Sequence, residues 1–212
     1  ALGKMRIVIS NADMSLPTPG SWMHVEALSS NVLPQLQSSD VFIYFGHIGP
    51  PPCPKSILCC SEGRRSSLRP DDRLTALHLS QYNSLTNADI LAAERVPQRA
   101  FLLGCAATDR SASTPAEILG LAQAFALRGA QVLAFGRRIK AQDAAEVLCA
   151  LSQQRLDNPD FDLGRFVMDT QRRFFKGERC NAQGKWYLPS CSQAAGDCSA
   201  PVDWQALRWY GP

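Results

Sequence analysis

The sequence lacks any apolar run long enough to cross a membrane. Its most apolar stretch, residues 100–107, is far shorter than the roughly 20 residues that a membrane-spanning helix requires. Charge of one sign is also scarce, because 22 Lys and Arg residues stand against 19 Asp and Glu residues, for a net charge of +3. Such a small excess does not make the basic surface that direct nucleic-acid binding needs. The first residues lack a signal-peptide pattern, so we expect a cytoplasmic protein.

Cysteine pairs with the two-residue gap of zinc knuckles and redox motifs are absent, although the chain has eight cysteines. Cys105 and Cys149 lie within apolar segments, where cysteine behaves as a small hydrophobic residue. We therefore expect reduced thiols, no metal and no cofactor. Two alternatives stay open. Cys180, Cys191 and Cys198 could form a disulfide or bind a metal, and these three together with Cys53, Cys59 and Cys60 could serve in redox or metal sensing.

The composition predicts one folded domain over residues 1–212, and we expect it to be cut from a longer chain because the first predicted strand begins almost at residue 1. Hydrophobic residues make up 45% and charged residues 19%, which argues against disorder and against a coiled coil. Two segments interrupt the pattern of elements: a long loop at residues 48–73, rich in Pro, Ser and Arg, and a polar insertion at residues 177–200.

Short apolar runs alternate with amphipathic segments along most of the chain. The runs predict strands over residues 5–10, 40–46, 74–79, 99–103, 130–135 and 204–210. The amphipathic segments predict helices over residues 22–36, 87–94, 114–128, 141–153 and 162–175. Because parallel strands need crossovers and these are normally helices, we expect a doubly wound α/β fold with a mostly parallel sheet of about six strands and helices on both faces.

Two reactive residues follow predicted strands. His47 comes after residues 40–46 and Cys105 after residues 99–103, each directly preceded by a glycine. Ligands of open α/β sheets bind at the carboxyl ends of the strands, so the pair is a candidate nucleophile and base if the two strands are neighbours. The alternative is that Cys105 only fills the core and that His47 is only hydrogen-bonded.

Several motifs occur in the order expected of one known family. They are residues 44–47 (YFGH) with Gly49, residues 84–91 (SLTNADIL), residues 101–108 (FLLGCAAT), residues 117–125 (EILGLAQAF) with 128–130, and residues 203–211 from Asp-Trp to Tyr-Gly. Together they resemble the CHAT domains, which are caspase-like peptidases often fused to tetratricopeptide repeats.

The resemblance implies a caspase-like cysteine endopeptidase of clan CD. Cys105 would attack the scissile carbonyl, and His47 would carry the proton between the thiol and the leaving amine. The backbone N–H of Cys105 and one N–H just after His47, from Ile48 or Gly49, would stabilise the oxyanion.

The sequence departs from the family pattern at several places, two of which bear on the site. Ile48 stands where the family generally has glycine directly after the histidine, which puts the oxyanion donor in doubt. Arg137 and Arg138 stand where relatives often have Leu-Trp-Pro, so they bear on substrate choice or form a solvated surface. Asp13, in the loop after the first strand, could bind a basic substrate residue, or it caps a turn.

The expected partners are a protein substrate and a regulatory partner or upstream repeat domain that activates the peptidase. A rival interpretation, which Ile48 motivates, is a caspase-like interaction module without turnover.

Overall fold

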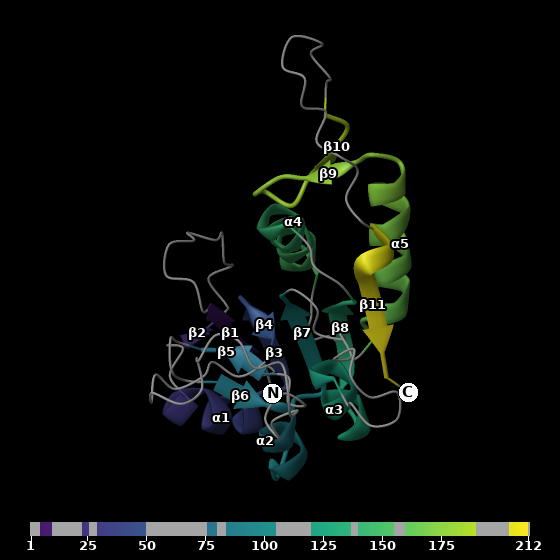
Figure 1. Ribbon diagram of the computed structural model, residues 1–212. Helices are drawn as coiled ribbons and strands as arrows, with labels where there is room; N and C mark the ends of the chain where they lie inside the picture. Colours follow the sequence, from purple (N-terminus) through teal and green to yellow (C-terminus); the bar gives the residue numbers. More distant parts are fainter. Residues whose placement is uncertain are drawn as a thin grey trace, which may run out of the picture.

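The computed structural model describes residues 5–9, 23–25, 29–49, 76–79, 84–104, 120–136, 140–154, 160–189 and 204–211 (Figure 1). Within these residues lies a central sheet of six strands. Its order is β11-β8-β7-β3-β1-β2, and only β11 runs antiparallel to its neighbour. The strands are β1 (Met5–Ile9), β2 (Met23–Val25), β3 (Val41–Phe45), β7 (Arg99–Leu103), β8 (Gln131–Phe135) and β11 (Leu207–Tyr210), the last preceded by the short helix η2 (Trp204–Ala206).

Helices lie on both sides of the sheet. They are α1 (Ser29–Ser38), α2 (Asn87–Ala92), α3 (Leu121–Leu127), α4 (Ala141–Ser152) and α5 (Leu163–Phe175). Figure 1 shows α4 on one side and α1, α2 and α3 on the other. This confirms the predicted α/β class with a mostly parallel sheet.

Alternate strand residues build two separate cores. Ile43, Phe101 and Leu133 belong to the core beneath α4 and α5, whereas Phe42 and Leu102 belong to the core beneath α1, α2 and α3. Every side chain of β3 and β7 is buried. Uninterrupted apolar strands of this kind are typical of parallel sheets covered on both faces.

The predicted ends of two helices are confirmed. Thr86 caps α2, because its hydroxyl accepts the N–H of Asp89 at 3.2 Å while the Asp89 carboxylate accepts the N–H of Thr86 at 2.8 Å. This reciprocal capping box satisfies two N–H groups that a helix start leaves unpaired. After the C-terminal end of α3, Gly129 has a φ of +91°, which glycine adopts without strain.

The predicted helix over residues 22–36 is wrong in its first part. Residues 23–25 form β2, which pairs in parallel with β1, and the helix α1 begins only at Ser29. The apolar spacing of Trp22, Val25 and Leu28 imitated a helical period in the sequence, although residues 23–25 form a strand. Pairing with the edge of β1 satisfies the backbone of this short segment, and sequence spacing cannot register that gain.

A second, three-stranded antiparallel sheet lies outside the main one. It consists of β4 (Ile48–Gly49), β5 (Ala76–His78) and β6 (Ser84–Thr86), in the order β4-β5-β6. The strand predicted at residues 74–79 therefore does not join the main sheet. The predicted loop 48–73 begins instead with β4, and its remainder lies outside the described residues.

Two further expectations need correction. Gly120 has an extended backbone, with φ −62° and ψ 163°, so α3 starts at Leu121 rather than running unbroken from Thr114. Glycine within a helix costs about 0.5–1 kcal/mol relative to alanine, which favours a break at this position. The predicted polar insertion begins with a hairpin, β9 (Arg179–Cys180) and β10 (Trp186–Tyr187), and both residues of β9 are buried.

Candidate active site

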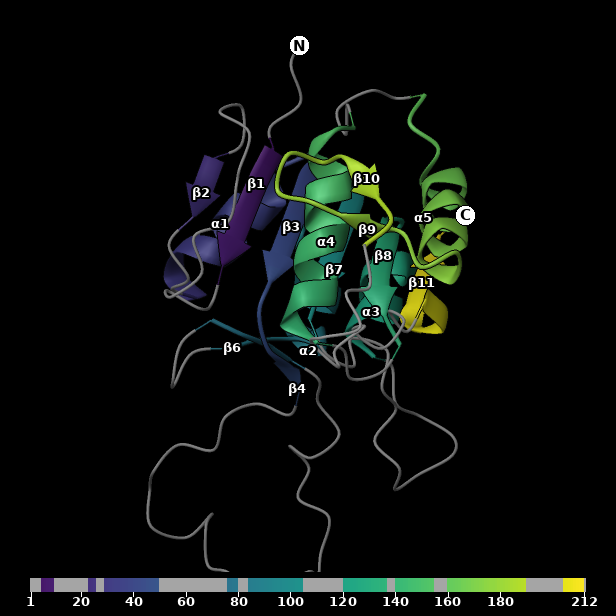
Figure 2. The same cartoon turned by 90° about the horizontal axis from the view of Figure 1, so that it is seen from above.

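The predicted nucleophile and base strands are neighbours. β3 and β7 pair in parallel, with Phe45 opposite Leu103, and β1 lies on the far side of β3 (Figure 2). The carboxyl ends of β1, β3 and β7 therefore meet at one edge of the sheet. His47 and Cys105 each follow the last paired residue of their strand by two positions. Cys105 itself lies outside the described residues, as do Asp13, Arg137 and Arg138.

Gly104, which precedes Cys105 in the chain, touches the segment around His47. A Cβ atom built on Gly104 would collide with the carbonyl oxygen of Gly46 and would lie 2.6 Å from Cγ1 of Ile48. The backbone N–H of Gly46 in turn donates to the carbonyl of Leu103 at 3.4 Å. The chain leading to the thiol and the chain carrying the imidazole are thus in direct contact.

The backbone of His47 is held by a buried hydroxyl. Tyr44, which has no exposed surface, places its hydroxyl oxygen 2.8 Å from the carbonyl oxygens of both His47 and His78, and its single O–H proton is shared between these two acceptors. The N–H of His78 also donates to the His47 carbonyl, at 3.0 Å. The side chain of His47 remains exposed to solvent, as a base that serves an incoming peptide must be.

His78 lies beside this site and was missed by sequence reasoning. Its ring meets the His47 ring edge to face, with centroids 4.7 Å apart and an interplanar angle of 82°. The available signal was a single polar residue inside an apolar run, because His78 stands between Leu77 and Leu79. That pattern marks one open face of a strand, and only the second sheet brings this face to His47.

Ile48 and Gly49 differ in where their N–H groups point. Opposed pairs of an antiparallel ladder alternate between hydrogen-bonded and non-hydrogen-bonded pairs. The bond from His78 to His47 makes 47/78 a hydrogen-bonded pair, so Gly49 opposite Ala76 is another, and Ile48 opposite Leu77 is not. The N–H of Gly49 is therefore directed toward β5, and that of Ile48 away from it. The branched side chain of Ile48, only 1% exposed, suits this strand position and packs over Gly104.

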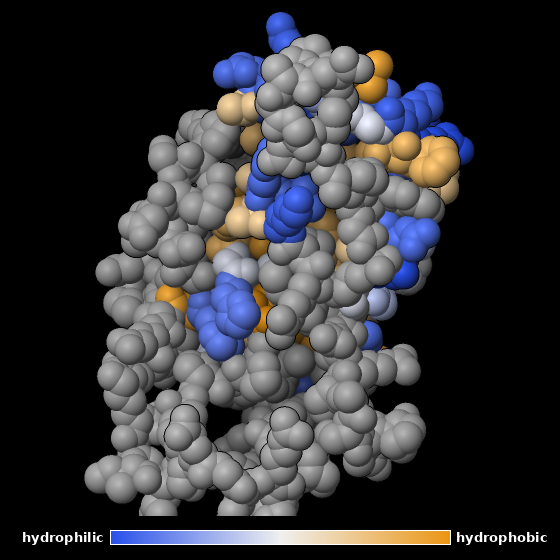
Figure 3. Space-filling model, turned by 45° about the horizontal axis from the view of Figure 1, so that its top comes forward, coloured by the Kyte–Doolittle hydropathy of each residue, from blue (hydrophilic) through white to orange (hydrophobic). Residues whose placement is uncertain are grey.

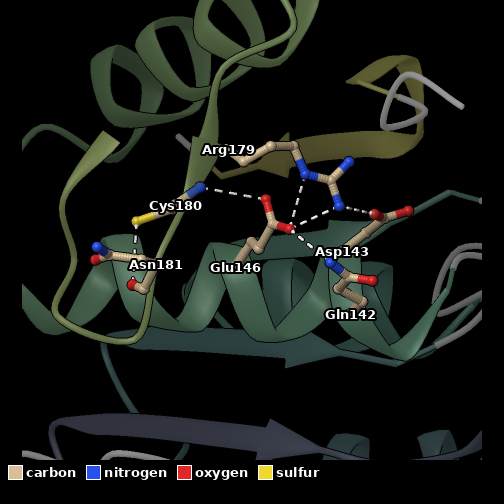
Figure 4. A network of polar contacts seen from close by, with 6 residues as sticks. All are labelled: Gln142, Asp143, Glu146, Arg179, Cys180 and Asn181. Carbon is tan, nitrogen blue, oxygen red and sulfur yellow. Dashed lines mark hydrogen bonds and ion pairs between the residues drawn. The ribbon is translucent and has the colours of Figure 1, made fainter. Parts of the chain in front are cut away.

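A buried ion cluster joins α4 to β9 (Figure 4). Arg179 contacts Glu146 at 2.6 Å and Asp143 at 3.3 Å, and the N–H of Cys180 donates to Glu146 at 3.3 Å. Burial raises the pKa of Asp143 above its ordinary value, against the opposing attraction of Arg179. The cluster fastens the β9–β10 hairpin to the helix.

The two described cysteines are buried free thiols. Burial raises the pKa of Cys180 to about 12, and burial also raises the pKa of Cys149. A thiol reacts as its thiolate, so neither sulfur is a nucleophile at neutral pH. The described residues contain no group of His, Cys, Asp and Glu side chains arranged to hold a metal ion. Cys53, Cys59, Cys60, Cys191 and Cys198 lie outside the described part of the chain.

A hollow also lies away from the candidate site. A cavity of about 770 Å³ opens between α4, α5 and the β9–β10 hairpin, and its lining includes Phe161, Arg173 and Trp186. Neither His47 nor Gly104 lines it. Large apolar side chains are exposed nearby, with Phe175 on α5 71% exposed and Leu188 after β10 69% exposed. Figure 3 shows hydrophobic surface beside hydrophilic surface on this part of the molecule.

None of the described helices is both long and apolar enough to span a lipid bilayer. No family model matches the chain, and a search of the curated proteins finds no similar sequence.

Proposed function

We propose that this chain is a caspase-like cysteine endopeptidase of the CHAT type, with Cys105 as nucleophile and His47 as proton carrier. The observation that carries the proposal is the parallel pairing of β3 with β7, in register up to Phe45 and Leu103. It brings the chain just before Cys105 against the chain around His47, where Gly104 contacts Gly46 and Ile48.

The strand order supports a ligand site at this edge. The five parallel strands lie in the order β2-β1-β3-β7-β8, which is 2-1-3-4-5 when only these five are numbered along the chain. The chain therefore changes its direction of winding between β1 and β3. Doubly wound sheets of this order bind ligands outside the carboxyl ends of their strands at this switch point. The residues that follow β1 and β3 include Asp13 and His47.

The reaction would proceed by acyl transfer. His47 takes the proton of the Cys105 thiol as the sulfur forms a bond to the scissile carbonyl carbon. The tetrahedral intermediate collapses, the C–N bond breaks, and His47 returns the proton to the leaving amine. Water, deprotonated by His47, then cleaves the thioester and releases the acid and the thiol. The N–H groups of Cys105 and Ile48 stabilise the oxyanion in acylation and in deacylation. We choose Ile48 over Gly49 as the second donor because the N–H of Gly49 is directed toward β5.

We assign substrate preference to residues that follow β1 and β8 in the chain. Asp13 would bind an Arg or Lys side chain before the cleaved bond, and Arg137 and Arg138, which follow β8, would contact acidic groups further along the substrate. The substrate is a protein, and a partner or an upstream repeat domain activates the enzyme. The buried free thiols of Cys149 and Cys180 suit a reducing cytoplasm.

A panel of fluorogenic peptides, varied at the residue before the cut, tests the activity. The assay uses the full chain with its activating partner, and compares the wild type with Cys105→Ala and with Cys149→Ala as the matched cysteine control. We expect cleavage after Arg or Lys that Cys105→Ala abolishes and Cys149→Ala retains. Cleavage that survives Cys105→Ala would overturn the nucleophile assignment, and a preference for Asp or Leu would overturn the role of Asp13.

A second candidate is an interaction module without turnover. Ile48 favours it, because a buried branched residue replaces the glycine that the family generally has after the histidine. Labelling with a peptidyl chloromethylketone separates the two. A Cys105 that stays unmodified in the assembled complex, while an unfolded sample reacts, would favour the module.

A further inference from the structure

The imidazoles of His47 and His78 form a contact pair at the candidate site. Their ring centroids are 4.7 Å apart and their planes meet at 82°, so the edge of one ring points at the face of the other. Aromatic rings favour this arrangement because a positive edge meets a negative face. The His47 side chain is exposed and the His78 side chain is half-buried.

The backbone forces the two rings together. β4 and β5 pair with Ile48 opposite Leu77, which sets His47 directly opposite His78. Side chains of directly opposed residues lie on the same face of a sheet, where they interact. The N–H of His78 donates to the His47 carbonyl, and the Tyr44 hydroxyl shares its proton between the carbonyls of both residues, which holds the two residues in this register.

An exposed imidazole that works as a base needs such a restraint. A free side chain populates several rotamers, and ordering it costs conformational entropy. Catalytic side chains work best when neighbouring groups hold them to within about 0.5 Å of the productive geometry. Among the described residues, His78 is the ring that packs edge to face with His47.

We propose that His78 is a positioning residue, which holds the His47 ring in the orientation needed to exchange a proton with Cys105. This inference rests on the proposed peptidase function. It concerns the shape of the His78 side chain, so a phenyl ring should do the same work and an aliphatic side chain should not. The contact is expected to change the rate of a step that depends on His47 by about three- to ten-fold. This factor corresponds to the usual interaction free energy of an edge-to-face ring pair.

Nuclear magnetic resonance relaxation of the histidine rings tests the proposal directly. The chain contains three histidines, His24, His47 and His78, so ¹³C labelling of histidine gives few signals to assign. The full chain is compared with His78→Ala, His78→Leu and His78→Phe, and each variant is melted to record its stability. The rate at which iodoacetamide alkylates Cys105 is measured on the same samples.

We expect His78→Ala and His78→Leu to raise the mobility of the His47 ring and to slow alkylation of Cys105 by about three- to ten-fold. His78→Phe should restore both. Comparison of Leu with Phe separates ring contact from general packing, because both fill the site and both are apolar. An unchanged His47 ring in His78→Leu, or no rescue by His78→Phe, would overturn the proposal.

His47→Ala distinguishes failure of the two claims. If His47→Ala leaves the alkylation of Cys105 unchanged, the peptidase dyad is wrong. His78 then has no catalytic base to position, even if it restrains the His47 ring in the wild type. If His47→Ala slows alkylation while the His78 variants do not, the dyad stands and the positioning role is wrong.

Discussion

The side chain of Ile48 lies directly over Gly104. A Cβ atom on Gly104 would come within 2.6 Å of Cγ1 of Ile48 and would also collide with the Gly46 carbonyl. The position after β7 therefore admits only glycine if the chain is to pass this close to the residues that flank His47. The hydrophobic packing of Ile48 and the approach of the chain after β3 to the chain after β7 are the same contact.

Gly104→Ala is expected to destabilise the fold by about 1–3 kcal/mol, the usual cost of overpacking a filled site. It should also slow alkylation of Cys105, because the β7 exit must move away from Gly46. Gly164→Ala is the matched control, since its Cβ would lie 3.4 Å from Oδ1 of Asp162 and 3.8 Å from the Trp209 ring, both in the range of ordinary contact. Urea unfolding measures the stability of both variants. Equal stability of the two variants would show that Gly104 is not closely packed.

Tyr44→Phe tests the anchor of the two histidines. It removes the hydroxyl that donates to the carbonyls of His47 and His78, and we expect a loss of about 0.5–1.5 kcal/mol of unfolding free energy. The His47 ring should also become more mobile in relaxation measurements. Tyr187→Phe, at a half-exposed position, should change stability by less than about 0.5 kcal/mol. Indistinguishable variants would contradict the anchoring role.

Asp143→Asn tests the electrostatics of the buried ion cluster. Burial raises the pKa of Asp143 above 3.8, so the folded chain keeps this proton to a higher pH than the unfolded chain does. The stability that Asp143 contributes is therefore complete below the unfolded pKa and falls as pH rises through the folded pKa. In urea unfolding from about pH 4 to about pH 7, the stability of the wild type relative to Asp143→Asn should fall. A relative stability that rises with pH would mean that attraction to Arg179 outweighs burial.

Cys149 and Cys180 are expected to resist alkylation in the folded chain. Burial raises the pKa of both thiols, that of Cys180 to about 12, which leaves almost no thiolate at neutral pH. Mass spectrometry after a short iodoacetamide pulse should find both unmodified, and both modified when urea is present. Rapid native labelling of Cys180 would contradict the burial of β9 against α4.

Sequence patterns predicted what depends on local order. The runs VFIYF and RAFLL gave β3 and β7, because strands buried on both faces need only apolar residues. The start of the helix predicted over residues 87–94 is also confirmed, because the Thr86–Asp89 capping box that fixes it lies within one turn of the chain.

What the patterns missed depends on partners distant in the chain. His78 contacts His47 only because β5 lies in the second sheet, where it pairs with β4. The Arg179 guanidinium can be buried because it pairs with the carboxylates of Glu146 and Asp143, which are 33 and 36 residues earlier in the chain. No rule of sequence spacing predicts such an ion pair.

The pH dependence of Cys105 alkylation in the wild type and in His47→Ala tests the central claim most directly. An isolated thiol has a pKa of about 8.5 and reacts slowly at neutral pH. We predict that the wild-type thiol reacts readily near pH 7, and that His47→Ala slows it at least about tenfold there while leaving the rate above about pH 9 similar. Identical profiles for the two proteins would contradict a dyad formed by Cys105 and His47.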